Sequence, residues 1–417
     1  MVSLLRRLVI QTVMAGLALL ITHPTQATQA IGPVTDPIGV IRIPAGAPIQ
    51  IGGYWVLSGP DTALGLDSKR GVEIAIAGVG GRLLGHPIQL NAEDDLCSAE
   101  GGQTAAIKLA SNPQTVAVLG SACSSATTPA APILWQAGIT NICTGCTAPS
   151  LTAPNRGPAY GGFLRTIAND GDQGVADARY LYEVVKARTI VTLHDGSPYA
   201  QELTSVVAAN FTRLGGKVLS REAIAPTDID MHPVLTRIAS EKPDALFMPI
   251  FIVAAAQILR QSMEVPGLER TTLVGGSSLA AADFIEAAGP SVIGFRICMT
   301  DISANAMGTG YPAFVDKYKK MYGEGPISNG HANAYDAAFL VFKAIEQVAK
   351  SDKAGNLYIG KKALRDAAFA VKFDGVSGRI ACDPYGECEA FKPAVYEFVS
   401  DDPKTFSIGT NPKKVWP

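Results

Sequence analysis

The chain has 417 residues, which is more than one ordinary hydrophobic core organises and suits two lobes. Hydrophobic residues make up 47% of it, charged residues only 17%, and the formal net charge at pH 7 is -2, as in a well-buried globular protein. Basic residues are scattered rather than clustered, which excludes nucleic acid and an anionic membrane surface as partners recruited by charge.

The first 30 residues have the three parts of a secretory signal peptide. Arg6 and Arg7 precede an apolar run over 8–21, and Pro24 and small residues follow. The run is too short to span a bilayer comfortably, and no cysteine for lipid attachment lies near the cleavage region. We therefore expect residues 1–30 to be removed and the mature chain to be periplasmic, without a membrane anchor.

Short β-branched runs then alternate with helical patterns. The first series predicts strands over 49–57, 87–94, 116–119 and 139–143, and helices over 66–79, 99–111 and 127–136. Strands separated by single crossover helices indicate a parallel sheet covered on both faces. The alternation pauses around 165–172 and then starts again.

A second series follows with the same regularity. It predicts strands over 190–194, 218–222, 245–248, 272–274 and 294–299, and helices over 199–214, 233–240, 254–263 and 280–287. Two further helices, over 311–322 and 332–349, are expected to cross back onto the first lobe. The predicted fold is therefore α/β, with two doubly wound parallel-sheet lobes and a cleft between them at the carboxyl ends of the strands.

Two segments at predicted strand ends carry one cysteine each. The first is Asp94-Asp95-Leu96-Cys97, and in the second Cys123 precedes a run of hydroxyl side chains that opens a helix. If the two cysteines are bonded, they hold hydroxyls and free backbone amides at a helix N-terminus, where a small anion docks. This favours a receptor for a small carboxylate. The alternative is that Ser124, Ser125 and Thr127 only cap the helix, while Asp94 and Asp95 are interpreted as turn residues.

The remaining cysteines have several interpretations. Cys382 and Cys388 flank a turn between two strand-like runs, so we expect a disulfide that closes a hairpin. Cys143 and Cys146 have the C-x-x-C spacing of redox and zinc sites, but the chain lacks a second such pair and suitably spaced histidines. A structural bond or buried thiols, with Cys298 as the odd cysteine, is the favoured interpretation.

Motifs of catalysis are absent from the sequence. It contains no G-x-S-x-G elbow, no phosphate-binding G-x-x-x-x-G-K-[ST] loop and no H-E-x-x-H. We therefore expect neither an enzyme nor a cofactor or metal site.

Seven motifs in register carry a resemblance to a known family. They are Gly59-Pro60, the turn at 80–85, Asp94-Asp95-Leu96-Cys97, 120–127, Leu164-Arg165-Thr166 with 170–174, His194-Asp195 with Tyr199, and 257–261. Together they resemble the leucine/isoleucine/valine-binding family of periplasmic solute receptors that feed ABC importers. The similarity runs from about Ile49 to about Val399.

The resemblance implies a type I periplasmic binding protein with three crossovers between its lobes. We place them near 165–168, 299–301 and 371–376. Lobe 1 then comprises 46–167 plus 301–372, and lobe 2 comprises 168–300 plus 373–417. It also implies a monomer that closes on a small ligand and docks on a membrane permease. The alternative is a sensor that reports the ligand to a signalling partner.

The family also implies a set of binding residues. A disulfide in the family matches Cys97 with Cys123, and Ser124 matches a residue that binds the α-carboxylate of the ligand. Thr147, with the backbone of Gly145 and Cys146, matches the second half of that clamp. Such fixed donors suit a carboxylate because charge-assisted hydrogen bonds offset its lost hydration.

The sequence departs from the family where the other end of the ligand is held. The acidic residue that binds the ligand ammonium in the family aligns with Ser277. The aromatic position after Gly59-Pro60 is Leu64. Tyr199 and Phe251 keep aromatic walls on the second lobe, and the alternative is that both are ordinary core residues. A zwitterion would lose a charged partner here, so the ligand is either of the branched-chain amino acid type or an aromatic or aliphatic acid without an amine. Three other carboxylates are candidates to replace the missing charge: Asp170, Asp195 and Asp283.

Overall fold

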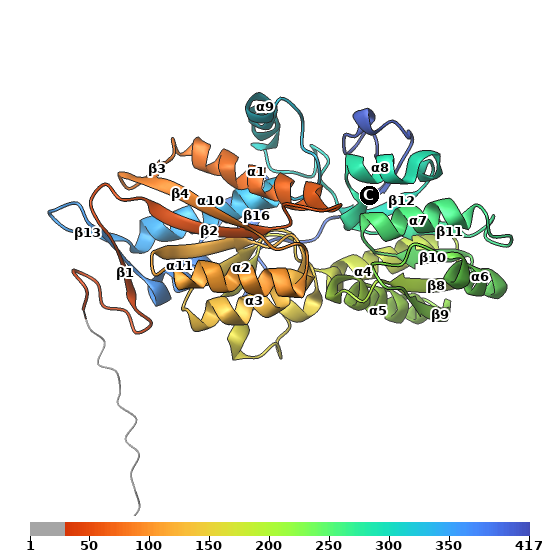
Figure 1. Cartoon of the computed structure of the whole chain (residues 1–417), viewed down its shortest axis with the longest axis horizontal. Coiled ribbons are helices and arrows are strands. Elements are labelled where there is room, and N and C mark those ends of the chain that lie inside the picture. The colour runs from red at the N-terminus through yellow and green to blue at the C-terminus, as the bar shows by residue number, and fades with distance from the viewer. Residues whose placement is uncertain (1–29) are drawn as a thin grey trace, which may run out of the picture.

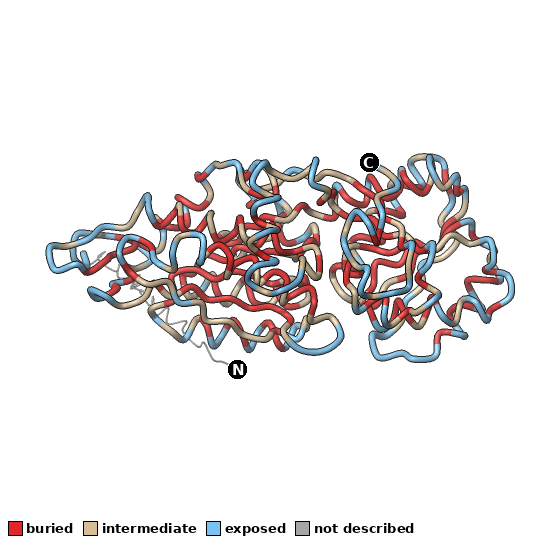
Figure 2. Tube along the Cα trace, turned by 90° about the horizontal axis from the view of Figure 1, so that it is seen from above, coloured by how far each residue is buried: buried red, intermediate tan, exposed pale blue. Residues whose placement is uncertain are grey.

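The computed structural model of the chain describes residues 30–417. Residues 1–29, which hold nearly all of the expected signal peptide (1–30), lie outside the described residues. The described chain forms two α/β lobes that lie side by side (Figure 1). The interior of each lobe is lined by buried residues (Figure 2), so each lobe has a core of its own. The predicted fold class is confirmed.

The first lobe is built on a six-stranded sheet in the order β3-β4-β2-β5-β6-β7, parallel except for the antiparallel β3. Its strands are β2 (Ile49–Trp55), β3 (Arg82–Leu83), β4 (His86–Asp94), β5 (Thr115–Gly120), β6 (Thr140–Cys143) and β7 (Phe163–Arg165). Side chains of β2 alternate between the two faces of the sheet. Ile51 and Trp55 face one apolar layer, and Tyr54 and Val56 face the other.

Helices cover both faces of this sheet. On the Trp55 face lie α1 (Thr62–Gly78), α10 (His331–Val348) and α11 (Lys361–Ala370), and on the Tyr54 face lie α2 (Ala99–Ser111) and α3 (Ser124–Gln136). Helix α9 (Tyr311–Tyr322) packs against α1 through Phe314 and Tyr318. The late helices α9 and α10 therefore lie on the first lobe.

The second lobe repeats the plan with a seven-stranded sheet in the order β18-β17-β12-β11-β10-β8-β9. Its strands are β8 (Thr189–His194), β9 (Lys217–Ala223), β10 (Ala245–Met248), β11 (Thr272–Gly275), β12 (Arg296–Thr300), β17 (Pro393–Glu397) and β18 (Lys413–Trp416). Its helices are α4 (Asp170–Arg179) with the π-helical turn Tyr180–Val184, α5 (Pro198–Arg213), α6 (His232–Glu241), α7 (Ile252–Ser262) and α8 (Ala282–Ala288). Strands β17 and β18 are antiparallel additions at one edge.

Smaller elements complete the chain. Strand β1 (Val40–Ile43) pairs with β14 (Leu357–Gly360), which also pairs with β13 (Lys350–Ser351), and β15 (Lys372–Asp374) forms a hairpin with β16 (Arg379–Ala381). Short 3-10 turns lie at Pro149–Leu151, Pro158–Tyr160, Ser277–Leu279, Gly289–Val292 and Pro403–Thr405.

The strand order places a switch point in each lobe. Strand β2 lies between β4 and β5, and β8 lies between β9 and β10, so successive crossovers leave the first strand in opposite directions. Ligands of open α/β sheets bind outside the carboxyl ends of the strands at such points. The two switch points bring their loops to the gap between the lobes.

The prediction that the chain makes its third crossover near 371–376 is wrong, because the chain stays with the first lobe there. The hairpin β15–β16 stays with the first lobe, because Ile380 is fully buried in that lobe's core and Phe373 packs against it. Cys388 belongs to the same core, and the chain joins the second sheet only with β17. Residues 373–388 are therefore reassigned to lobe 1. That lobe also begins before residue 46, since β1 supplies Ile41 and Ile43 to its core.

Candidate ligand-binding cleft

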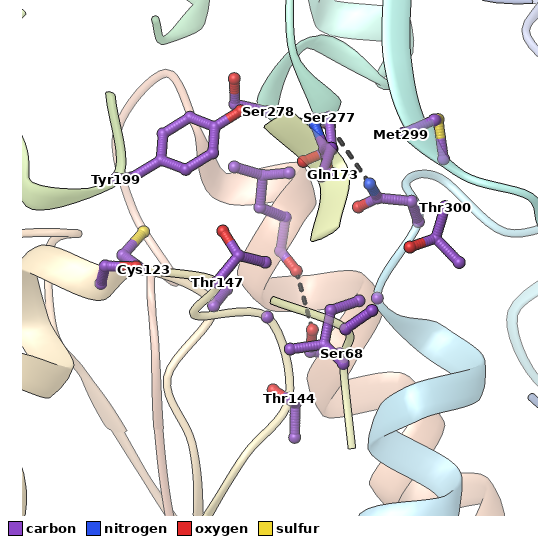
Figure 3. Close-up of a pocket in the computed structure, with 18 of the residues that line it drawn as sticks. Ser68, Cys123, Thr144, Thr147, Gln173, Tyr199, Ser277, Ser278, Met299 and Thr300 are labelled. Carbon is purple, nitrogen blue, oxygen red and sulfur yellow. Dashed lines mark hydrogen bonds between the residues drawn. The ribbon is translucent and has the colours of Figure 1, made fainter. Parts of the chain in front are cut away.

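A pocket lies between the lobes at the carboxyl ends of both sheets (Figure 3). Among residues 30–417, its lining contains hydroxyl, amide and apolar side chains and no charged one. The lining residues are Leu64, Ser68, Ala122, Cys123, Ser124, Thr144, Gly145, Thr147, Ile167, Ala168, Gln173, Tyr199, Phe251, Ser277, Ser278, Met299, Thr300, Ile302, Asn329 and Gly330. Seven of the eight predicted ligand residues are among them. The exception is Cys146, which is fully buried and turns its carbonyl to Arg165.

The start of α3 forms one side of the cleft. The helix begins at Ser124, three residues before the predicted start, and Cys123 is its N-cap residue without a side-chain cap bond. The first turn of a helix leaves backbone N–H groups without intrahelical partners, and it favours negative charge. Ser124 does not serve as the cap, because its Oγ instead accepts a hydrogen bond from the Ala148 N–H at 3.1 Å. The interpretation of Ser124 as only a helix cap is therefore wrong.

Asp95 ties the two cysteine segments together beneath this helix start. Cys97 and Cys123 are bonded, as predicted. The buried carboxyl of Asp95 accepts from the Cys97 N–H at 2.9 Å and from the Ser121 hydroxyl, and Ser121 Oγ in turn accepts from the Cys123 N–H at 2.9 Å. Burial raises the pKa of Asp95 to about 6. Asp95 thus stabilises the turn and does not line the pocket, which agrees with its interpretation as a turn residue.

Thr147 and Gly145 follow β6 and lie next to Ser124. Gly145 packs so closely on the next loop that a Cβ there would lie 2.9 Å from the Cα of Ala122. The Thr147 hydroxyl donates to Asp170 Oδ2 at 2.7 Å, and the Thr147 side chain faces the cleft (Figure 3). Because Ala148 N–H bonds Ser124 Oγ, the two halves of the predicted clamp are joined directly.

Asp170 is a buried carboxyl directly behind Thr147. It begins α4, is fully buried, and its Oδ1 has no hydrogen-bond partner in the described chain. Burial raises the pKa of Asp170 to about 7, and the hydrogen bond from Thr147 and the charge of Arg165 offset that effect only in part. The protonation state of Asp170 therefore changes close to neutral pH.

The second lobe supplies an aromatic wall. The rings of Tyr199 and Phe251 lie 5.9 Å apart, and Tyr199 is also part of the core of its lobe. The Tyr199 hydroxyl is buried without a hydrogen-bond partner in the described chain, and burial raises its pKa. Tyr199 and Phe251 are thus both core residues and cleft residues.

Ser277 lies on the same side of the cleft, and the dashed line beside its label in Figure 3 ends at its backbone. The Asn329 side chain, from the first lobe, donates its Nδ2–H to the Ser277 carbonyl at 3.2 Å. None of the three candidate carboxylates Asp170, Asp195 and Asp283 lines the cleft. Asp195 instead accepts from the N–H and the hydroxyl of Ser197 at 3.0 and 2.6 Å.

Besides the bond from Thr147 to Asp170, further hydrogen bonds join the two lobes around the cleft. Besides the Asn329 contact, the Ile252 N–H at the start of α7 donates to Asp61 Oδ1 of the first lobe at 3.3 Å. Ser150 donates its N–H and hydroxyl to Glu202 of α5 at 2.8 and 2.6 Å. The structure therefore shows the lobes in contact around the pocket.

Several cleft residues escaped sequence reasoning. Gln173 is 4% exposed and donates to the Cys298 carbonyl at 3.2 Å, and it belongs to a recognised motif that could have drawn attention to it. Ser68 lies on α1, and Asn329 precedes α10, in a stretch that no motif marks. These positions reach the cleft only through the folding of distant segments.

The other cysteines pair as two disulfides. The Cys382–Cys388 bond is confirmed, Cys143 and Cys146 are bonded to each other, and Cys298 is a buried free thiol. Within residues 30–417 no cluster of three or more metal-ligating side chains occurs. In the same part of the chain, no helix is long and apolar enough to cross a bilayer.

Two doubly wound lobes with a hydroxyl-lined pocket at their facing switch points define a two-lobed receptor for a small ligand. The chain matches the model of the Periplasmic binding protein family over residues 48–386. It therefore belongs to that family, and its Leu/Ile/Val-binding relatives place it in the branch that the sequence resembles.

Individual relatives agree with this assignment. The Leu/Ile/Val-binding protein of Escherichia coli (strain K12) is 31% identical over 251 residues, which cover 60% of this chain and 66% of that protein. A leucine-binding protein from Thermotoga maritima superposes with a TM-score of 0.75 at 23% identity, covering 85% of this chain and 96% of the other. A solute-binding protein from R. palustris in complex with benzoate gives 0.73 at 20% identity, covering 89% and 96%. At these identities the two structures show the shared fold alone.

Proposed function

We propose that this protein is the periplasmic receptor of an ABC importer, that it is not an enzyme, and that it binds a small carboxylate of the branched-chain amino acid type. The observation that carries the proposal is the start of α3, where Ser124 and Thr147 meet at a cleft wall without charged side chains. A carboxylate that enters a closed cleft loses its hydration and needs donors that are already in place. The free amides of a helix N-terminus and the Ser124 hydroxyl are such donors, and the Thr147 hydroxyl joins them when Asp170 is protonated.

A second candidate ligand is an acid that lacks the amine. The lining offers no carboxylate to an ammonium group. The resemblance to the family aligns Ser277 with the acidic residue that binds the ligand ammonium, and a serine carries no charge. The Ser277 carbonyl already accepts a hydrogen bond from Asn329, so one more acceptor is occupied. The benzoate bound by the R. palustris relative is consistent with this candidate, because that molecule is an acid without an amine.

The two candidates are separated by ligands that share one skeleton. L-leucine carries both the carboxylate and the amine. 4-Methylpentanoate carries the carboxylate alone, and 3-methylbutylamine carries the amine alone. Benzoate adds an aromatic acid. We expect the carboxylates to raise the melting temperature of the mature protein and the amine to leave it unchanged, because only ligands that bind the native state stabilise it. Binding of 3-methylbutylamine as tight as that of the acids would contradict the carboxylate site. A response to L-leucine alone would eliminate the amine-free class.

A further inference from the structure

A small disulfide-closed loop lies against the hinge beside the cleft. Cys382 and Cys388 are bonded, and within the loop the Asp383 N–H donates to the Glu387 carbonyl at 2.8 Å. The loop is joined to the end of β7 on both sides of Arg165. The Arg165 N–H donates to the Gly386 carbonyl at 2.8 Å, and the Cys388 N–H donates to the Arg165 carbonyl at 3.1 Å. The backbone thus places Glu387 next to Arg165.

The guanidinium of Arg165 connects this loop to the cleft. Arg165 is fully buried, and its Nε–H donates to both carboxylate oxygens of Glu387 at 3.1 and 3.0 Å. Its Nη1 donates to the carbonyls of Cys146 at 3.2 Å and Ala148 at 2.9 Å. These two carbonyls lie immediately before and after Thr147. One rigid cation therefore holds the backbone on either side of a clamp residue.

The carboxylate of Glu387 is the counter-ion that keeps this cation in place. Burial opposes the ionisation of Glu387, but its hydrogen bonds and the charge of Arg165 prevail and lower its pKa. A buried guanidinium that loses its carboxylate becomes an uncompensated charge and moves toward other acceptors or water. Glu387 also accepts from Asn169 Nδ2 at 2.8 Å, at the N-cap of α4 in the second lobe.

We propose that Glu387 is a positioning residue for the carboxylate side of the cleft. Glu387 holds the Arg165 guanidinium in place. The guanidinium in turn fixes the positions of the Cys146 and Ala148 carbonyls, and these orient Thr147. Glu387 does not line the pocket, so it acts through Arg165 and not by contact with the ligand. The expected change in ligand affinity rests on the proposed carboxylate-binding function. The expected change in amide hydrogen exchange is independent of any ligand.

The binding test uses Glu387→Gln in the mature protein, with L-leucine and 4-methylpentanoate as probes in titration calorimetry. The matched control is Glu397→Gln, which breaks another Arg–Glu pair, Arg296 Nε to Glu397 Oε2 at 2.7 Å, between strands of the second lobe. We expect Glu387→Gln to weaken binding by roughly tenfold to a hundredfold, the range known for groups that orient metal ligands. The control should change affinity less than about twofold, as for a rim-exposed pair.

A double-mutant cycle tests whether the effect passes through Thr147. In a Thr147→Ala background, Glu387→Gln should cost less than about twofold, because the side chain it positions is gone. A loss as large as in the wild-type background would overturn the positioning role and assign Glu387 to general hinge stability.

Amide hydrogen exchange tests the proposal without any ligand. The Ala148 N–H, which donates to Ser124 Oγ, should exchange at least about tenfold faster in Glu387→Gln and at the wild-type rate in Glu397→Gln. Unchanged exchange at Ala148 would overturn the proposal even if neither probe binds. If neither probe binds the wild-type protein while Ala148 exchange rises as expected, the proposed ligand class fails and the positioning role stands.

Discussion

We expect Asp170 to make ligand affinity depend on pH, in a direction that follows from the geometry. Its Oδ2 lies 2.7 Å from the Thr147 hydroxyl, and Asp170 has a pKa of about 7 because it is buried. A ligand carboxylate within hydrogen-bond distance of Thr147 would lie ~5 Å from the Asp170 carboxyl. Two unit negative charges at ~5 Å, with an effective dielectric constant of about 20, repel each other by ~3 kcal/mol. Bound ligand therefore favours the neutral form of Asp170.

The sign of the effect follows from this repulsion. Below pH 7 Asp170 is largely protonated in the free protein, and the ligand pays no electrostatic penalty. Above pH 7 binding must be accompanied by the uptake of a proton, so the dissociation constant should rise by up to about tenfold for each pH unit. Protonated Asp170 also donates to Thr147 Oγ1, which frees the threonine hydroxyl to donate to the ligand.

Asp170→Asn is the variant that isolates this effect. Its affinity for 4-methylpentanoate should be the same at pH 6.5 and 8.5, and at pH 8.5 it should bind more tightly than the wild type. Asp172→Asn, two residues along α4 and exposed, is the matched control and should keep the wild-type pH dependence. Calorimetry in two buffers of different ionisation enthalpy measures the proton uptake directly. No proton uptake at pH 8.5, or an unchanged pH dependence in Asp170→Asn, would refute the reasoning.

The same carboxyl predicts a pH-dependent stability. Because the pKa of Asp170 is raised in the folded state from 3.8 to about 7, its contribution to stability is fully present below pH 3.8 and is lost as the pH rises through about 7. Asp170→Asn should therefore raise the melting temperature relative to the wild type more at pH 8 than at pH 5. A larger gain at pH 5 would contradict the burial argument.

Three further predictions concern the cleft. Ser124→Ala and Thr147→Ala should each weaken carboxylate binding by about tenfold to a hundredfold, the value of a hydrogen bond to a charged group, and titration calorimetry that finds both affinities unchanged would remove the clamp. Ser277→Glu supplies the missing negative charge, so it should increase the affinity for L-leucine about tenfold and decrease the affinity for 4-methylpentanoate about tenfold. A change of both affinities in the same direction would contradict the ammonium argument. Asp61→Asn weakens the bond from the Ile252 N–H across the cleft, so small-angle scattering of the ligand-free protein should show a larger radius of gyration, and an unchanged radius would mean that this contact does not hold the lobes together.

The features that could be predicted from the sequence lie where one short segment carries a strand end, a disulfide cysteine and a cleft residue together. The end of β5 runs from Gly120 through Cys123 into Ser124, so the strand, disulfide and helix start are contiguous and their chemistry can be read locally. Thr147 follows the end of β6, and its place in the clamp came from the resemblance to the family and not from a local motif. Parallel strands deliver such segments to one edge of the sheet, which is why both segments reach the cleft.

Features that depend on contacts between distant segments could not be predicted from the sequence. Asn329 enters the cleft because Asp67, fully buried in α1, accepts from the N–H groups of Gly330 and His331 at 3.0 and 2.9 Å and so anchors the loop before α10. The short hairpin that contains Ile380 carries too few residues for its pattern to tell which core it joins. Its burial in the first lobe moved the third crossover beyond the expected place.

The two ends of the cleft differ in how far their residues are tied into the fold, and this determines where ligand preference can change. Replacing Ser124 removes the acceptor of the Ala148 N–H, and replacing Thr147 leaves the buried Asp170 with one partner fewer. Both changes cost the protein a buried hydrogen bond as well as the proposed ligand contact. Ser277 is half-buried and meets Asn329 through its carbonyl, a bond that any residue at this position retains. We therefore expect a change of charge at Ser277 to alter the ligand preference without loosening the proposed clamp, so that the same residues of the first lobe serve amino acids and amine-free acids.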